Sequence, residues 1–221
     1  ECAQQFLRTA PANVDFQKLC NDLIVISDAT AIAFNLFDEN GKDFTTVAFS
    51  YNNKSISAFS SILGFEIIGK HWKFDAVRAE KIKEKCITRF SKLHELTGTI
   101  LPDKLIDTLE NILGLGETYV VKIEKDNIIL GDFTLIFKKD ESLKNEKLID
   151  LYSHLVGMLI DREKISKVLK QSEAKASAIL RTLPDMLFIQ NKDGVYLDFY
   201  LPENTVKFDP PKVFIGQRME N

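Results

Sequence analysis

The residues best suited to chemistry in this sequence are its histidines and cysteines, because imidazole and thiol groups ligate metals and react near neutral pH. The histidines are His71, His94 and His154, and the cysteines are Cys2, Cys20 and Cys86. The cysteines are odd in number, far apart and without a C-x-x-C pair, which favours a reducing compartment. Haem would require an axial ligand such as one of the histidines, but no neighbouring pattern marks any of them. The sequence therefore leaves the cofactor unknown.

Two of the cysteines differ in their surroundings. Cys20 lies beside Leu19 and Leu23 on a predicted helix face, so we expect it to be a small core residue. Cys86 lies in the charged run 81–89, where neighbouring cations could lower the pKa of a thiol. A reactive or tetrapyrrole-attaching role for Cys86 is the alternative to a structural one.

The chain carries no known catalytic motif. It lacks G-x-S-x-G, H-E-x-x-H, a P-loop and the Cys/His spacing of a metal site, and its carboxylates fall on charged helical faces. A net charge of −3 provides no basic stripe for a nucleic-acid backbone. Charged residues interrupt the apolar windows, so we expect no membrane contact by this segment. The 221 residues suffice for one domain and part of a second, in a soluble and non-catalytic segment.

The first third of the chain has the pattern of a helix followed by strands. Apolar residues at helical spacing, with Asn13 as the N-cap, predict a helix over 13–27. The β-rich segments 31–38 and 44–51 flank a turn-forming stretch and predict a strand pair. The apolar segment 56–68 is a candidate for a third strand.

The middle of the chain has a helical pattern. Asp75 is expected to cap a charged helix that runs through Lys85, and Pro102 begins a second helix that Gly114 ends. The second helix has an apolar face formed by Leu105, Ile106, Leu109, Ile112 and Leu113.

Two β-hairpins are predicted, one on each side of a long helix. Segment 117–124 alternates apolar and polar residues, and after the polar turn 125–127 the segment 128–138 returns as a strand. Segments 186–191 and 195–201 flank an Asp-Gly turn, which is a strong hairpin signal between β-rich arms.

One long helix is predicted over 145–183, where Gly157 is the single interruption by glycine or proline. A heptad register holds throughout it, and only Arg162 and Ser172 are polar at the core positions. At 1.5 Å per residue, about 38 residues extend roughly 57 Å, so the second half must bury its stripe outside its own domain. A parallel second copy is the simplest partner, which predicts a homodimer. The seam consists of Leu155, Met158, Arg162, Ile165, Leu169, Ser172, Ala176 and Ile179.

Residues 12 to about 162 resemble a known domain family. The order helix, two strands, helical insertion, two strands and exit helix resembles the GAF domain, as found in multidomain sensor histidine kinases of archaea and bacteria. This resemblance implies an α+β fold, in which terminal helices cover one face of an antiparallel sheet and a ligand-facing region covers the other. The segments that carry it are 62–75, 89–96, 114–123 and 130–136.

A second resemblance begins at the end of the long helix. Segments 179–189, 192–199 and 210–216 are similar to the start of a PAS domain in the same class of kinase. Together the two resemblances imply a cytoplasmic fragment of a two-component signalling protein. The implied parts are an N-terminal linker at 1–11, a GAF-like sensory domain at 12–144, an exit helix and coiled-coil linker at 145–183, and a partial PAS-like domain at 184–221.

Two short motifs invite comparison with functions of these families. His94-Glu95-Leu96 resembles the phosphoacceptor box of histidine kinases, but Thr97-Gly98-Thr99 departs from the continuation expected there. Asn53-Lys54 supplies the first half of a cyclic-nucleotide motif, but no phenylalanine is followed by Asp-Glu at the required offset. We therefore expect neither phosphorylation of His94 nor binding of a cyclic nucleotide.

A ligand cavity would be expected where the sheet meets the helical insertion, because small-ligand sites are mostly apolar with few polar anchors. Burial in the core is the alternative for the residues that flank this junction. These residues are Phe49, Tyr51, Trp72, Phe90, His94 and Tyr119.

The preferred hypothesis is a regulatory sensory and dimerisation module that relays ligand binding or conformational state along the long helix. Arg162 and Ser172 would weaken any single register of a helix pair, which favours a bistable seam. A ligand-free structural and dimerisation spacer is the second hypothesis. The third is a catalyst of unfamiliar type, which would require carboxylates or histidines gathered in one cleft.

Overall fold

The computed structural model describes residues 14–39, 41–52, 61–73, 75–83, 85–97, 101–182, 187–200 and 215–218. The chain divides into two compact units, Glu1–Glu163 and Lys164–Asn221. The boundary between them falls within the longest helix.

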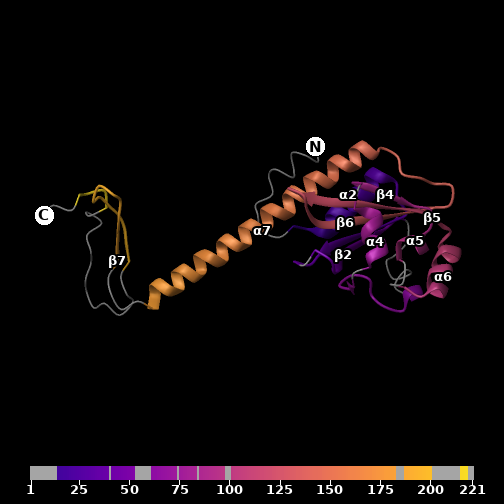
Figure 1. Ribbon diagram of the computed structural model, residues 1–221, viewed down its shortest axis with the longest axis horizontal. Helices are drawn as coiled ribbons and strands as arrows, with labels where there is room; N and C mark the ends of the chain where they lie inside the picture. Colours follow the sequence, from indigo (N-terminus) through magenta and orange to yellow (C-terminus); the bar gives the residue numbers. More distant parts are fainter. Residues whose placement is uncertain are drawn as a thin grey trace. The chain divides into compact units, whose positions relative to one another are not determined.

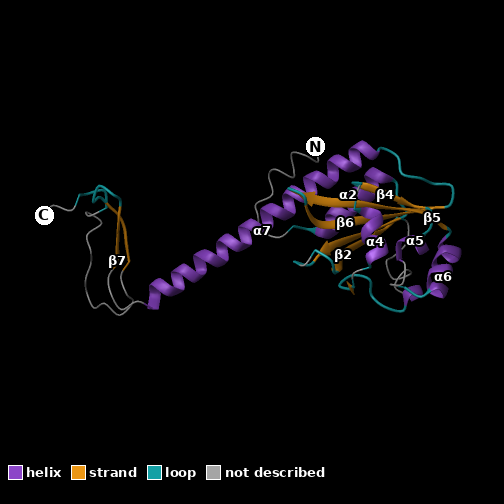
Figure 2. Ribbon diagram, viewed as in Figure 1, coloured by secondary structure: helices purple, strands orange, loops and turns teal. Residues whose placement is uncertain are grey.

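The first unit is built on a six-stranded antiparallel sheet with the order β3-β2-β1-β6-β5-β4 (Figures 1 and 2). Its hairpins β1-β2 and β5-β6 meet where β1 pairs with β6, with Ala31 opposite Ile136. Gly131 permits this pairing, because a Cβ there would lie 2.2 Å from the carbonyl oxygen of Asn35. The strands are β1 (Ala31–Phe37), β2 (Phe44–Tyr51), β3 (His71–Trp72), β4 (Ile87–Phe90), β5 (Leu115–Lys125) and β6 (Ile128–Lys138).

Helices cover both faces of this sheet (Figure 1). One face carries α2 (Phe16–Ser27) and the first part of α7 (Glu146–Thr182), and the other carries α4 (Ala76–Ile82), α5 (Leu93–Thr97) and α6 (Asp103–Leu113).

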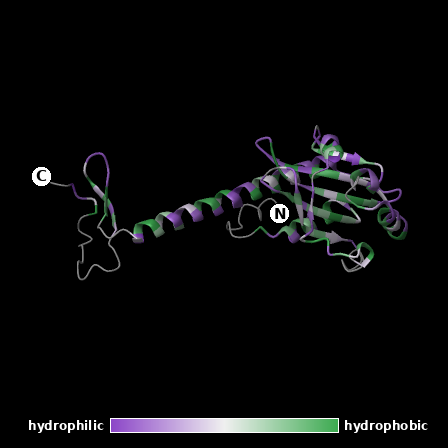
Figure 3. Cartoon of the chain, turned by 60° about the horizontal axis from the view of Figure 1, so that its bottom comes forward, coloured by the Kyte–Doolittle hydropathy of each residue, from purple (hydrophilic) through white to green (hydrophobic). Residues whose placement is uncertain are grey.

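Alternation along the strands divides the core into two layers. Phe34 and Phe133 join the layer under α2 and α7. Ala33, which precedes Phe34, and Ile136 on β6 join the layer under α5 and α6. The strands are therefore apolar on both faces, and Figure 3 shows most of the sheet in the colour of hydrophobic residues.

In its first part, α7 has one face buried against the sheet and an opposite face that is exposed. Ile149, Tyr152 and Val156 are buried against it, and Gly157 allows a close approach to β5. A Cβ at Gly157 would lie 2.8 Å from a backbone carbonyl oxygen of that strand. The predicted seam residue Met158 is 50% exposed.

After Glu163, which is buried, the side chains of α7 are almost all exposed. Hydrophilic and hydrophobic residues alternate along this part of the helix (Figure 3). Among the helices that the structure describes, none combines the length and apolar character needed to cross a membrane.

The second unit contains the end of α7 and the hairpin of β7 (Leu187–Gln190) and β8 (Tyr196–Tyr200). The amide groups of Asp193 and Val195 donate to the side-chain oxygen of Asn191, and Gly194 adopts a φ of 76°. This turn holds the two strands together, as the Asp-Gly signal predicts.

Several boundaries differ from the sequence-based expectations. In the segment 56–68, residues 56–60 lie outside the described residues, 61–63 are helical and 64–68 contain turns and bends. The next described strand after β2 is the short β3. The helix capped by Asp75 ends at Ile82 and not at Lys85, because the chain must turn into β4, a strand that the sequence pattern did not reveal. The predicted N-cap Asn13 lies outside the described residues, and Asp15 caps α2.

The remaining elements agree closely with prediction. The helix expected over 145–183 is α7, and both predicted hairpins form. In α6 the residues Ile106 and Leu109 of the predicted apolar face are buried, whereas Ile112 is exposed.

Candidate functional site

A cavity of about 100 Å³ lies between the sheet and the helical insertion. The sheet contributes residues of β1, β2, β3 and β6, and the opposite walls come from α4, α5, α6 and the segment before β3. Most of the wall is apolar. Its polar members are Asn35, Thr46, Trp72, Arg78, Thr97 and Thr134.

The polar wall on the sheet is one connected hydrogen-bond chain. The indole Nε1 of Trp72 donates to Oγ1 of Thr46 at 2.9 Å, and this hydroxyl donates to Oδ1 of Asn35 at 2.7 Å. Nδ2 of Asn35 donates to Oδ1 of Asp132 at 2.8 Å and lies 3.3 Å from Oγ1 of Thr134. Buried polar groups are stable when they are partnered in this way.

Arg78 closes the chain from the helical side of the cavity. Its Nη2 lies 2.5 Å from Oδ2 of Asp132, whose side chain is 0% exposed. The guanidinium carbon lies 4.6 Å from the centre of the Phe44 ring, so the cation also stacks on an aromatic face. The helix α4 is held in place by Asp75, whose side chain accepts from the backbone amide of Arg78. This buried ion pair joins α4 to the middle of the sheet.

The six residues expected near a ligand separate into three pairs. Phe49 and Trp72 line the cavity. Phe90 is buried in the core of the same face, and Tyr51 packs against that core, but neither is a wall of the cavity. The other two, His94 and Tyr119, lie elsewhere.

Tyr119 lies on the opposite face of the sheet, in the core under α7. Its hydroxyl donates to Oε2 of Glu117 at 2.5 Å, and Arg89 pairs with the other oxygen of that carboxylate. Burial, followed by this hydrogen bond, raises the pKa of Tyr119. The hydrogen bond from Tyr119 is also the largest cause of the lowered pKa of Glu117. This group stabilises the edge of the sheet away from the cavity.

The histidines do not line the cavity among the residues that the structure describes. His94 is exposed and its Nε2 lies 2.9 Å from Oδ1 of Asp103. His154 is exposed on α7 and its Nδ1 lies 2.8 Å from the carbonyl oxygen of Asp150. An axial haem ligand in this cavity is therefore not available from His71, His94 or His154.

The two described cysteines are both on the α7 side of the sheet. Cys20 is buried in α2, and burial raises the pKa of its thiol to about 12. Sγ of Cys86 lies 3.8 Å from Oγ of Ser153 on α7, and burial is the largest cause that raises its pKa to about 11. The lowered pKa considered for Cys86 is thus wrong in direction, because desolvation and the neighbouring carboxylates of Asp150 and Glu124 disfavour the thiolate. Neither thiol faces the cavity to attach a tetrapyrrole.

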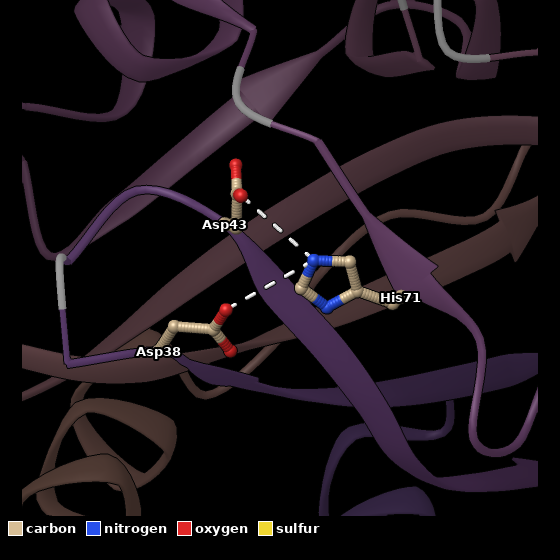
Figure 4. A group of neighbouring side chains, drawn as sticks. All are labelled: Asp38, Asp43 and His71. Carbon is tan, nitrogen blue, oxygen red and sulfur yellow. Dashed lines mark ion pairs between the residues drawn. The ribbon is translucent and has the colours of Figure 1, made fainter.

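A group of possible metal ligands lies at the outer end of the β1-β2 hairpin (Figure 4). Figure 4 shows the ring of His71 between the carboxylates of Asp38 and Asp43, at 3.9 and 3.8 Å from Nε2. The ammonium group of Lys73 lies 3.0 Å from Oδ2 of Asp43, and Thr45 contacts Nδ1 of the ring. Because a cation already pairs with Asp43 and water reaches the group, we interpret it as a surface ion-pair cluster.

Comparison with protein-family models and with curated proteins finds no match. Solved structures do match. The chromophore-binding domain of an unusual bacteriophytochrome, RpBphP3 from R. palustris, has a TM-score of 0.51 at 9% identity, over 74% of this chain and 59% of that chain. The bacteriophytochrome RpBphP3 itself has a TM-score of 0.55 at 11% identity, over 80% of this chain and 40% of that chain. The chain thus spans less than two thirds of each of these two solved chains.

A third solved structure, the PixJ GAF-domain of Thermosynechococcus elongatus in its blue-light absorbing form, has a TM-score of 0.46 at 18% identity, over 72% of this chain and 89% of that chain. The expected fold class is confirmed. The first unit is a GAF-like α+β domain with a six-stranded antiparallel sheet, flanking helices and a long helix near the C-terminus.

Proposed function

We propose that this chain is a regulatory sensory module that binds a small molecule in the cavity and reports its presence through α7. The cavity and α7 lie on opposite faces of one sheet, and this arrangement is the observation that carries the proposal. An apolar cavity with a few convergent polar groups is the form that small-ligand sites take.

The sheet provides a short route between the two faces. Asp132 belongs to the polar chain at the cavity, and the next residue, Phe133, points to the other face. The ring of Phe133 lies 6.1 Å from the ring of Tyr152 on α7, whose hydroxyl donates to the carbonyl oxygen of Leu19 on α2. A ligand that displaces the polar chain would therefore disturb the contact between β6 and α7.

Dimerisation through α7 is the second part of the proposal. The seam runs along the side of the helix that faces away from the sheet, and its members Met158, Ile165 and Leu169 are each at least half exposed. A second copy would cover this stripe along both the sheet-packed and the extended parts of the helix. Such a pair places the reporting element at the twofold interface.

The parent protein is, in our proposal, a sensor histidine kinase in which a PAS domain follows α7. The resemblance of segments 179–189 and 192–199 supports this, together with the hairpin formed by β7 and β8. Coding sequence after Asn221 that encodes a complete PAS domain, a phosphoacceptor helix and ATPase motifs would support this parentage, and a different output domain would exclude it.

A ligand-free spacer is the competing function. Its support is that the cavity is small and that its polar chain is largely satisfied by the protein itself. Native mass spectrometry of protein purified from its source separates the two, because a sensor should carry a stoichiometric small molecule and a spacer should be an empty dimer.

A pair of matched variants locates the bound molecule. Ala33→Leu fills the cavity and should remove the retained mass while the dimer persists. Ala178→Leu makes the same chemical change at an exposed position of α7 outside the seam and should leave both unchanged. A monomer without a retained molecule in every sample would refute the proposed function.

A further inference from the structure

The hydrogen bonds in the cavity wall run in one direction. The indole of Trp72 can only donate, so Oγ1 of Thr46 accepts from it and the hydroxyl proton points to Asn35. Oδ1 of Asn35 is then the acceptor and its amide nitrogen is the donor to Asp132. The hydroxyl of Thr134 also donates to Oδ1 of Asp132, at 3.4 Å. The protons of the sheet wall are thus directed at one buried carboxylate.

Arg78 is the residue of the cavity wall whose side chain has unused hydrogen-bond donors. A guanidinium has five N–H groups, and Asp132 receives a bond from Nη2 alone. Within the described part of the chain no other group accepts from the guanidinium, although the residue is 6% exposed and lines the cavity. The strongest open hydrogen-bonding positions at this wall are therefore the charged N–H donors of Arg78.

Charge at the wall is balanced before any ligand enters. Asp132 offsets the positive charge of Arg78, and Arg78 is the one charged residue among the described residues of the cavity wall. An anion would enter an apolar space without net positive charge, and a cation would find no free carboxylate, so both would lose hydration without compensation. A neutral group that accepts a hydrogen bond avoids this loss.

The size of the cavity limits the ligand further. A cavity of about 150 Å³ lined by apolar side chains holds benzene, and this one measures about 100 Å³. We propose that the cavity binds a small neutral molecule, of no more than about six non-hydrogen atoms, whose single hydrogen-bond acceptor docks on Arg78. This inference rests on the proposed sensory function and specifies its ligand class.

Three probes of similar size test the ligand class on the full chain. Cyclopentanone is neutral with one acceptor, cyclopentane lacks the acceptor, and isobutyrate is an anion. Methyl and indole NMR resonances of the cavity residues, including the Trp72 indole N–H, report binding. We expect cyclopentanone to bind at least roughly tenfold more tightly than either of the others, since a hydrogen bond from a charged donor is strong.

Arg78→Met together with Asp132→Asn removes the guanidinium donors without leaving a buried charge unpaired. Because the introduced amide is a neutral and weaker donor, this double variant should lose most of the preference for cyclopentanone over cyclopentane while still binding cyclopentane. Arg78 also borders a wider hollow of about 310 Å³, so Ala33→Leu serves to assign the binding to the cavity. Cyclopentanone binding should be abolished by Ala33→Leu.

The outcomes separate the ligand class from the sensory function. Tighter binding of cyclopentane or isobutyrate in the unaltered chain overturns the ligand class but leaves a ligand-binding cavity, and this comparison stands even if the double variant does not fold. Binding that survives Ala33→Leu places the probe in the wider hollow and overturns the inference. If neither these probes nor xenon shifts the cavity resonances, the inference and the proposed ligand sensing both fail.

Discussion

Leucine at the two polar seam positions should greatly strengthen dimerisation through α7. Arg162 and Ser172 lie on the same stripe as Ile165, Leu169 and Ile179, which are 60%, 57% and 62% exposed in the single chain. These apolar side chains are available to be buried by a partner, but the polar pair interrupts them. A dimer of the unaltered chain must also overcome about 4–15 kcal/mol of lost translational and rotational freedom. The unaltered seam should therefore be only moderately stable.

The magnitude follows from the number of side chains that change. Arg162→Leu with Ser172→Leu places four additional leucines in a dimer, and a fully buried leucine stabilises by about 1.5–3 kcal/mol. Because helix pairs leave their seams partly open, we take half of this value, or about 3–6 kcal/mol for the four. The dissociation constant should then fall roughly a hundredfold to ten-thousandfold. Sedimentation velocity across a concentration series measures this change.

A matched control distinguishes a specific dimer interface from nonspecific hydrophobic association. Lys164→Leu with Gln171→Leu likewise replaces one charged and one polar residue, at exposed positions of α7 outside the seam. This control should leave the dissociation constant nearly unchanged. An unaltered constant in the seam variant, or an equal gain in the control, would refute the assignment of the interface to this stripe.

Two further perturbations test the interior of the first unit. Arg78→Met should lower the free energy of unfolding by about 3–5 kcal/mol in urea titrations, because it leaves Asp132 buried without its cation, and adding Asp132→Asn should restore much of the loss. A single variant as stable as the unaltered chain would contradict the buried ion pair. The raised pKa values of Cys20 and Cys86, about 12 and about 11 against an ordinary 9.0, predict slow alkylation of both thiols in the folded chain below pH 9. Because the thiols of the unfolded chain ionise at a lower pH than those of the folded chain, the free energy of unfolding should fall as the pH rises above 9 toward these values. Fast alkylation at neutral pH, or a free energy of unfolding that does not change with pH in this range, would count against the burial of these thiols.

Strongly periodic segments of the sequence sufficed to predict most of the fold. The alternation over 117–124, the β-rich segment 128–138 and the heptads of 145–183 correspond to β5, β6 and α7, because burial on one or both faces of an element leaves a regular or continuous apolar pattern. The short strands β3 and β4 were missed, since two and four residues leave no period to detect. Their positions are set by pairing with β2 and β5, which is a tertiary effect.

The candidate site was predicted only in outline. Aromatic content at the junction of sheet and insertion pointed to Phe49 and Trp72, and both line the cavity. The other polar residues of the wall were not singled out, because Asn35 and Thr46 in a strand look like ordinary solvent-facing positions. The local pattern cannot tell that a helical insertion will cover that face.

Asp132 shows what decides whether a polar residue of a strand faces solvent or is buried. It lies between Gly131 and Phe133 within a run of buried residues of β6, where a charged side chain read from the sequence alone would be assigned to solvent. Its complete burial depends on the cation of Arg78, which lies 54 positions away in the sequence and is carried by α4. A buried carboxylate without that cation would be expensive, so α4 and the sheet are stable only together. The same pairing leaves the remaining N–H groups of Arg78 at the cavity, which means that the contact that secures the fold also creates the polar anchor available to a ligand.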